Sequence, residues 1–207
     1  MDKLINKIES LKKNQINNLV NNRVKEFKDL GKRTSNEIFK ELCFCLLTAN
    51  FNAEKSIMIQ EKIGDNFLTL SKEDLAKKLT ELGHRYPNIR AKYISDSVKY
   101  KQLLKNMINN SKDKEIREWL VKNVKGLGYK ESSHFLRNIG FDDLAIIDFH
   151  IVDILVDNNL IERPKCLTRK KYLEIEKILR NLAKKTNLTL SKLDLYLWYI
   201  ETGKILK

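Results

Sequence analysis

The sequence predicts an all-α fold, and three observations support that prediction. Only seven glycines and two prolines occur in 207 residues. Apolar residues recur at intervals of three and four through most of the chain, and no segment shows the alternation typical of a β-strand. Polar residues that can cap helices stand before several apolar segments. A chain of this length can bury a sizeable core as one unit or as two small lobes.

Periodicity and capping signals place the helices of the first half of the chain. Thr34 and Glu37, three residues apart, predict a capping box before an apolar helix that belongs in a core. Asn52 and Ser71 can each cap a later helix, and a glycine stands where each should stop. In order, the predicted elements are one or two amphipathic helices over 2–30, a helix over 38–49, one from Asn52 to Gly64, one from Ser71 to Gly83, a polar loop over 84–90 and a helix over 91–108.

Residues 115–156 carry the most informative pattern of the chain. A helix ends at a glycine hairpin, a second helix stops at Gly140, and Asp148 opens a third. Two of the seven glycines, Gly126 and Gly128, are only two residues apart, which indicates a backbone brought close to something. Their amides lie at a helix N-terminus and can bind a phosphate group.

Lys130 lies in the first turn of the helix that follows this hairpin. The positive end of the helix dipole disfavours an ammonium there and favours the neutral amine that a nucleophile needs. A carboxylate, Asp148, follows 18 residues later. The phosphate-binding amides, the lysine and the carboxylate together suit covalent catalysis on nucleic acid. Two simpler interpretations stay open: Lys130 as a solvated surface charge, and Asp148 as only a helix cap.

The motif G-L-G-Y-K over 126–130, followed by I-D-F-H over 147–150, resembles the helix-hairpin-helix DNA glycosylases of the endonuclease III superfamily. The wider run over 125–148 is most similar to the archaeal-type (type 2) 8-oxoguanine DNA glycosylases with AP lyase activity. Three further blocks are similar to that family: LCFCLLTAN over 42–50, LGHRY…RAKYI over 82–94 and LDLYLWY…TGKILK over 193–207. The resemblance therefore covers nearly the whole chain.

The resemblance implies two helical lobes with an active-site cleft between them. Residues 35–147 are expected to form a helical-barrel lobe that contains the helix-hairpin-helix at about 115–140. Residues 1–34 and 148–207 are expected to form the second lobe, which closes the base pocket. The last helix, expected to be capped by Ser191 with Asp194, is apolar nearly all round and must face more than one surface.

The resemblance also implies a bifunctional DNA repair enzyme that acts on double-stranded DNA. Lys130 would displace 8-oxoguanine and form a Schiff base, Asp148 would assist it, and β-elimination would nick the strand 3′ to the site. Two alternatives stay open at this point. One is a glycosylase of the same fold for oxidised pyrimidines, and the other is a non-catalytic helix-hairpin-helix DNA-binding module.

Three further residues are candidate DNA contacts by resemblance, besides the hairpin glycines. Asn50 would fill the gap that the extruded base leaves, although an asparagine at a helix end can also satisfy backbone carbonyls. Arg90 would read the base opposite the lesion, or would be an ordinary surface arginine. His150 would contact a phosphate, with helix capping or packing as the alternative.

Two residues near the end of the chain are candidates for the base pocket. Trp198 would be either part of the core or a plate on which an extruded purine stacks. The resemblance favours stacking. It also implies that the carboxylate of Lys207 accepts a hydrogen bond from the purine.

No cofactor is expected to be required. The resemblance implies a possible K⁺ or Na⁺ ion at the backbone carbonyls of Lys122, Val124 and Leu127. An iron–sulfur cluster is not expected, because the three cysteines (Cys43, Cys45, Cys166) do not form the spaced set of four that cluster-bearing relatives carry. Two residues depart from the family pattern: Phe149 stands where arginine is usual, and Lys125 where proline is frequent.

The charge of the chain fits a polyanionic partner. Forty basic residues against 27 acidic ones give a net charge of +13. A lysine-rich proteome would produce the same excess, so charge alone does not identify the partner. No signal-peptide core or 18-residue apolar run is present, and we therefore expect a soluble cytoplasmic protein, monomeric and without membrane contact.

Overall fold

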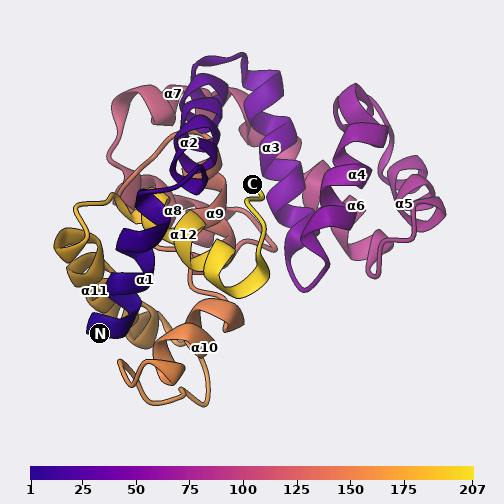
Figure 1. Ribbon diagram of the computed structural model, residues 1–207. Helices are drawn as coiled ribbons and strands as arrows, with labels where there is room; N and C mark the ends of the chain where they lie inside the picture. Colours follow the sequence, from indigo (N-terminus) through magenta and orange to yellow (C-terminus); the bar gives the residue numbers. More distant parts are fainter.

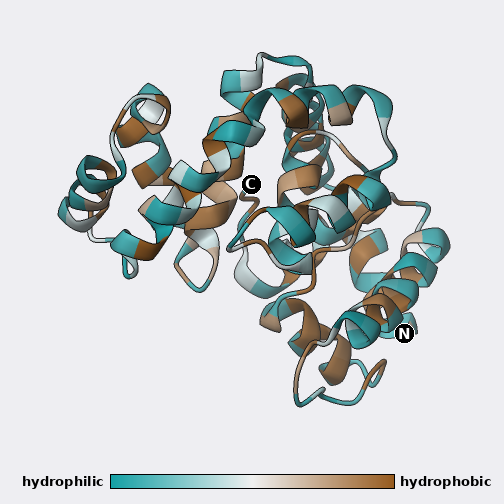
Figure 2. Ribbon diagram, turned by 180° about the vertical axis from the view of Figure 1, so that it is seen from behind, coloured by the Kyte–Doolittle hydropathy of each residue, from teal (hydrophilic) through white to brown (hydrophobic).

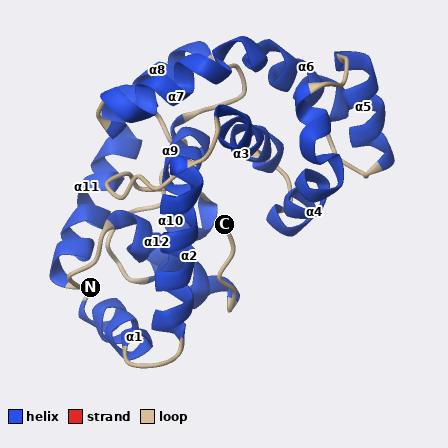
Figure 3. Ribbon diagram, turned by 90° about the horizontal axis from the view of Figure 1, so that it is seen from above, coloured by secondary structure: helices blue, strands red, loops and turns tan.

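The computed structural model describes residues 1–207, and all of its regular elements are helices (Figure 3), so the all-α prediction is confirmed. The α-helices are α1 (Asp2–Lys12), α2 (Ile16–Lys32), α3 (Ser35–Thr48), α4 (Ala53–Ile63), α5 (Lys72–Glu81), α6 (Pro87–Ser97), α7 (Lys101–Asn110), α8 (Asp113–Asn123), α9 (Tyr129–Asn138), α10 (Phe149–Asp157), α11 (Arg169–Lys185) and α12 (Leu190–Thr202). Two 3₁₀ segments, η1 (Gly64–Leu68) and η2 (Val98–Tyr100), follow α4 and α6.

The capping signals of the first half of the chain are confirmed. The Thr34 hydroxyl accepts a hydrogen bond from the Glu37 amide at 3.3 Å, and the Glu37 carboxylate accepts one from the Thr34 amide at 3.2 Å. The Asn52 side chain accepts a hydrogen bond from the Lys55 amide at 2.9 Å and so opens α4. Local hydrogen bonds of this kind need only neighbouring residues, which is why the sequence predicts them well.

Two predicted elements differ from the structure. The helix expected over 91–108 begins earlier, because Pro87 is preset for a first helical turn, and η2 interrupts it. The cap of the last helix is Thr189, whose hydroxyl accepts a hydrogen bond from the Lys192 amide at 3.3 Å, so the prediction of Ser191 was wrong. Ser191 is buried, and Asp194 pairs with a buried arginine instead of completing a cap.

The hydrophobic residues form two separate cores. One cluster of 24 buried residues runs from Ile38 to Leu144 and joins α3 to α9. The other, of 22 residues, combines α1 and α2 with buried residues between Ala145 and Leu197. The expected lobe boundary at residue 147 lies three residues beyond this change of cluster. Figure 2 shows that hydrophobic residues gather on helix faces that are turned toward one another.

The first and last helices of the chain belong to the same lobe. The first two helices and α12 pack side by side, although they are far apart in the sequence (Figure 1). Gly203, in the left-handed conformation at φ +71°, ends α12, and the segment after it runs to α3 of the other cluster. This segment therefore bridges the two cores.

Three cysteines have free thiols, two in the core and one on the surface. Cys43 and Cys45 are buried in α3, and Cys166 is exposed in the connector before α11. Burial raises the pKa of both α3 thiols well above the ordinary value. As for the membrane, every helix is too short or too polar to cross a bilayer.

Candidate active site

A cavity of about 880 Å³ lies between the two clusters. The turn between α3 and α4, the first turns of α9 and α10, and the last part of α12 with the segment after it form its walls. Six of the predicted site residues line it: Asn50, Lys130, Asp148, His150, Trp198 and Lys207.

Lys130 is the second residue of α9 and lines this cavity. Its side chain is 24% exposed, and the only carboxylate oxygen within 4 Å of its Nζ belongs to the neighbouring Glu131, at 3.8 Å. A surface lysine with its charge in open solvent would be far more exposed. The half-buried position gives the amine access to a ligand in the cavity while limiting its contact with water.

Asp148 combines the capping role with a place in the cavity. Its Oδ1 accepts a hydrogen bond from the Ile151 amide at 3.0 Å, which opens α10. Its Oδ2 makes no hydrogen bond within the protein, and the residue lines the same cavity as Lys130. The cap holds the carboxylate in place and leaves one oxygen available for chemistry.

The structure requires glycine more strictly at one of the two hairpin positions than at the other. Gly126 has φ +91°, and a Cβ there would lie 2.4 Å from the ring of Tyr93, so no other residue fits without displacement. Gly128 has an extended backbone, and a Cβ there would meet only Glu131, at 3.5 Å. The amides of Gly126, Gly128 and Tyr129 donate to no backbone carbonyl, so they are available to an anion.

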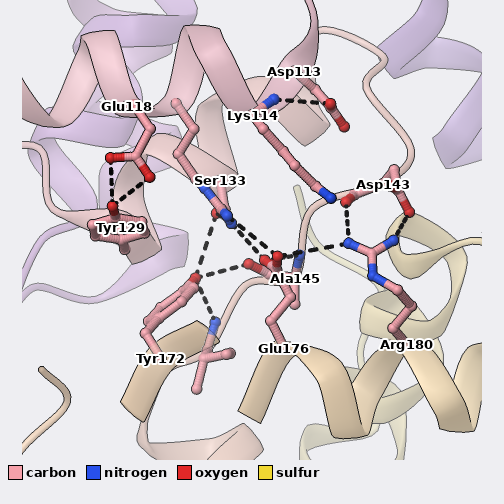
Figure 4. Close-up of polar contacts among 12 residues, drawn as sticks. Asp113, Lys114, Glu118, Tyr129, Ser133, Asp143, Ala145, Tyr172, Glu176 and Arg180 are labelled. Atoms are coloured by element: carbon pink, nitrogen blue, oxygen red, sulfur yellow. Dashed lines mark hydrogen bonds and ion pairs between the residues drawn. The ribbon is translucent and has the colours of Figure 1, made fainter. Parts of the chain in front are cut away.

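A buried polar cluster holds α8 and the segment before α10 against α11 (Figure 4). Arg117 of α8 is 2% exposed, and its Nη1 lies 2.5 Å from Glu176 Oε2. The same Glu176 oxygen accepts a hydrogen bond from the Ala145 amide at 3.2 Å. The Tyr172 hydroxyl donates to the Ala145 carbonyl at 2.7 Å and accepts from the Ile147 amide at 3.2 Å. The segment that leads to Asp148 is thus fixed by α11.

Three aromatic rings line the cavity beside Asp148. Trp198 is half-buried, and its ring meets that of His150 edge-on with centroids 5.0 Å apart. The ring of Phe149 also contacts that of His150, with centroids 4.1 Å apart and the planes tilted by 38°, and Phe149 is 67% exposed. His150 Nδ1 also lies 3.8 Å from a carboxylate oxygen of Glu201. Trp198 therefore lines the cavity with its ring against His150.

The comparisons with known proteins agree with one another. A family model described as 8-oxoguanine DNA glycosylase matches residues 20–188. The 8-oxoguanine DNA glycosylase/AP lyase of Methanocaldococcus jannaschii is 53% identical over 205 residues, 99% of each chain. That of Korarchaeum cryptofilum is 52% identical over 209 residues, 100% of this chain and 99% of the other.

Solved structures support the same assignment. The M. jannaschii 8-oxoguanine glycosylase/lyase in complex with a 15mer DNA containing 8-oxoguanine superposes with a TM-score of 0.96, over 99% of this chain and 100% of that chain. The Thermotoga maritima 8-oxoguanine DNA glycosylase, which is 44% identical, superposes with a TM-score of 0.94 over 100% of this chain and 99% of that chain. The chain belongs to the 8-oxoguanine DNA glycosylase family. The family resemblance of its sequence motifs is confirmed.

Arg90 does not reach the cavity of this glycosylase. It lies on α6, is 7% exposed, and its Nη2 donates a hydrogen bond to the Ala49 carbonyl at 2.5 Å. The sequence placed it in a loop, but the helix begins at Pro87 and turns it inward. Arg90 supports the turn that carries Asn50, which is exposed and left-handed at φ +57°. Arg85, five residues earlier, does line the cavity.

Sequence reasoning missed the place of a further carboxylate in the cavity, that of Asp194 of α12. It pairs with Arg137 of α9, and both residues line the cavity. Burial raises the pKa of Asp194 to about 6; the charge of Arg137 opposes this rise and that of Asp148 adds to it. The only sequence signal was a charged residue within an otherwise apolar helix.

His134, one turn after Lys130, is also buried at the cavity. Burial lowers its pKa well below the ordinary value, the charges of Arg137 and Lys130 lower it further, and a hydrogen bond with the backbone of Lys207 opposes the shift. The imidazole is therefore neutral near pH 7, and it adds no positive charge next to the lysine.

Proposed function

We propose that this protein excises 8-oxoguanine from duplex DNA and then nicks the strand 3′ to the site, as a glycosylase with AP lyase activity. The observation that carries the proposal is the placement of Lys130, Asp148 and Trp198 around one cavity. It brings together an amine nucleophile, a carboxylate and an aromatic ring on which a base can stack. The family and its DNA-bound structure support duplex DNA with an oxidised purine as the substrate.

In the proposed mechanism the neutral amine of Lys130 attacks C1′ of the damaged nucleotide. The bond between C1′ and the base breaks, and the base leaves with the bonding electrons. Asp148 accepts the proton that the amine loses, or stabilises the cationic sugar. The amine and the opened sugar then form an iminium ion. Loss of a C2′ proton breaks the bond between C3′ and its phosphate, which nicks the strand.

We propose that Trp198 and Lys207 form the base pocket. The damaged nucleotide must leave the stack, which costs a few kcal/mol and costs less for a damaged pair. The ring of Trp198 offers a surface on which a purine can stack, and the segment that ends at Lys207 closes the cavity beside it. Asn50, which has a left-handed backbone within the α3–α4 turn, would occupy the gap left in the duplex.

The DNA backbone would follow the hairpin and the start of α10. The free amides at Gly126 and Gly128 and the imidazole of His150 suit phosphate groups on either side of the extruded nucleotide. The net charge of +13 supports such binding.

The carbonyls at the hairpin also suit a K⁺ or Na⁺ ion. Those of Lys122 and Leu127 accept no backbone hydrogen bond, and that of Val124 accepts one, from the Leu127 amide at 3.2 Å. Backbone carbonyl oxygens are hard ligands of the kind these ions prefer. Such an ion would add positive charge where a phosphate is expected.

Borohydride trapping on a duplex with one 8-oxoguanine tests the proposal. The wild type should form a covalent adduct, and Lys130→Gln should form none, because an amide cannot make the iminium ion that borohydride reduces. An adduct that persists in Lys130→Gln would exclude Lys130 as the nucleophile. Binding of DNA without any adduct in the wild type would favour the non-catalytic DNA-binding module.

A second duplex, carrying thymine glycol, distinguishes the purine from the pyrimidine substrate. We expect faster release of 8-oxoguanine, because the stacking surface of Trp198 suits the larger base. Faster release of thymine glycol would favour the pyrimidine alternative. The Trp198→Leu variant should lose the preference for the purine if the ring is what selects it.

A further inference from the structure

A buried carboxylate receives the side chain of the last residue. Glu41 of α3 is 3% exposed, and its Oε2 lies 3.0 Å from Lys207 Nζ. Gln60 Nε2 donates to the same oxygen at 3.2 Å, and Asn138 Nδ2 donates to Oε1 at 2.7 Å. Lys207 is the only cation that contacts Glu41. The segment after α12 is therefore tied into the core of the first cluster.

The contacts continue from Glu41 to the opposite wall of the cavity. The side-chain oxygen of Asn138 accepts hydrogen bonds from Arg137 at 3.1 and 2.9 Å. Arg137 in turn pairs with Asp194 of α12. The position of Lys207 is thus linked through side chains of α3 and α9 to a carboxylate beside Lys130 and Asp148.

The ammonium of Lys207 has a site shaped for it. Besides Glu41 and the Gln60 amide oxygen, its Nζ lies 4.2 Å from the centre of the Phe44 ring, a cation–π distance. The other ion pair of this segment, between Lys204 and Glu54, is more than half exposed on both sides. Exposed pairs contribute little. The buried pair, together with the contact between His134 and the backbone of Lys207, defines where the end of the segment lies.

The energetics of buried ion pairs indicate the role of the Glu41–Lys207 pair. A hydrophobic pair of the same volume often stabilises a core as well or better, whereas a buried carboxylate without its cation is strongly unfavourable. Such a pair admits one arrangement of the segment and excludes others. We propose that Glu41 is a positioning residue for base recognition: it binds the ammonium of Lys207, and Leu206 and Lys207 thereby form a fixed wall that faces the extruded purine. This inference rests on the proposed function.

Two substrates separate this role from a structural one. The first is a duplex with 8-oxoguanine, and the second is the same duplex with an abasic site. The wall of Leu206 and Lys207 contacts the extruded base. An abasic site has no base, so β-elimination at an abasic site does not need the wall. Glu41→Gln should slow single-turnover excision of 8-oxoguanine by about tenfold or more and leave nicking of the abasic duplex within about twofold of wild type.

Three further variants complete the test. Lys207→Met should have the same selective effect, and the double variant Glu41→Gln/Lys207→Met should be no slower than the slower single variant, because the contact is already lost. Asp65→Asn is the matched control. It makes the same carboxylate-to-amide change in an ion pair of α3, between Asp65 and Lys40 at 2.7 Å, where Asp65 is 82% exposed. Both activities should be unchanged.

The outcomes separate this inference from the function on which it rests. A wild type that does not excise 8-oxoguanine would overturn both. An active wild type whose Glu41→Gln variant keeps full excision, or loses both activities equally, would overturn only the role of Glu41. If Glu41→Gln does not fold, Glu41→Leu/Lys207→Met replaces the pair with apolar groups and should fold. Full excision of 8-oxoguanine by that variant would also overturn the role.

Discussion

Asp148 and Asp194 are two carboxylates of one cavity with different surroundings. Asp148 caps α10 at the surface of the cavity, whereas Asp194 is buried against Arg137. Burial raises the pKa of Asp194 to about 6 from 3.8. Two acids with different environments can hold different protonation states at one pH, which is how many sites separate a proton acceptor from a neutral partner.

The raised pKa of Asp194 predicts a pH dependence of stability. Between pH 4 and 6 the folded protein binds a proton at Asp194 that the unfolded chain has released, so the free energy of unfolding falls as pH rises through this range. The total loss should be on the order of 3 kcal/mol. Asp194→Asn should lack this component of the slope. Urea unfolding of the wild type and of Asp194→Asn from pH 4 to 8 measures this slope. The same pH dependence of the free energy of unfolding in both proteins would contradict its assignment to Asp194.

Phe149 predicts a change in the salt dependence of DNA binding. It is 67% exposed at the cavity, in the first turn of α10, where an arginine could reach a phosphate group. Phe149→Arg should steepen the slope of log affinity against log salt by about 1, because one more counterion is released. Phe149→Leu is the control without charge and should leave the slope unchanged. Titrations of an abasic-analogue duplex at several salt concentrations provide the measurement.

At the scale of elements, the hairpin between α8 and α9 depends on one glycine more than on the other. Gly126→Ala places a Cβ 2.4 Å from the Tyr93 ring at φ +91° and should lower the free energy of unfolding by about 1 to 3 kcal/mol. Gly128→Ala meets only Glu131, at 3.5 Å, and should cost less than half as much. Chemical denaturation of both variants measures the difference. Equal losses would mean that the hairpin yields at both positions.

The elements that the sequence predicted correctly depend on local signals. Thr34 and Glu37 specify their capping box within four residues, and the glycine hairpin with Lys130 lies within five. Arg90 illustrates the limit, because whether it faces solvent or the Ala49 carbonyl depends on how α6 packs on α3. The pair of Arg137 and Asp194 brings together residues 57 positions apart, which no local pattern reveals.

At the scale of the whole molecule, the two hydrophobic cores are joined by buried charges. Arg117 belongs to α8 of the first cluster and Glu176 to α11 of the second, and both are almost fully buried. The Glu41–Lys207 pair makes the same kind of connection from the other side of the cavity. The cavity therefore lies between two lobes that ion pairs hold in register.

The Arg117–Glu176 pair predicts a large loss of stability. Glu176→Gln leaves the buried Arg117 without its counter-charge and should lower the free energy of unfolding by about 3 to 5 kcal/mol. The double variant Arg117→Met/Glu176→Leu should recover most of this loss, because neither charge then remains buried. Denaturation curves of the two variants and the wild type measure these free energies of unfolding. A double variant as unstable as Glu176→Gln would show that packing, and not charge, is what the pair supplies.

The burial of Cys43 and Cys45 has a consequence for an enzyme that removes oxidised bases. Peroxide reacts with thiolates, and both side chains lie in the core with their pKa raised, so they stay protonated and inaccessible. The remaining sulfhydryl, Cys166, is exposed but does not line the cavity. The oxidative conditions that create the substrate should therefore leave the repair chemistry itself intact.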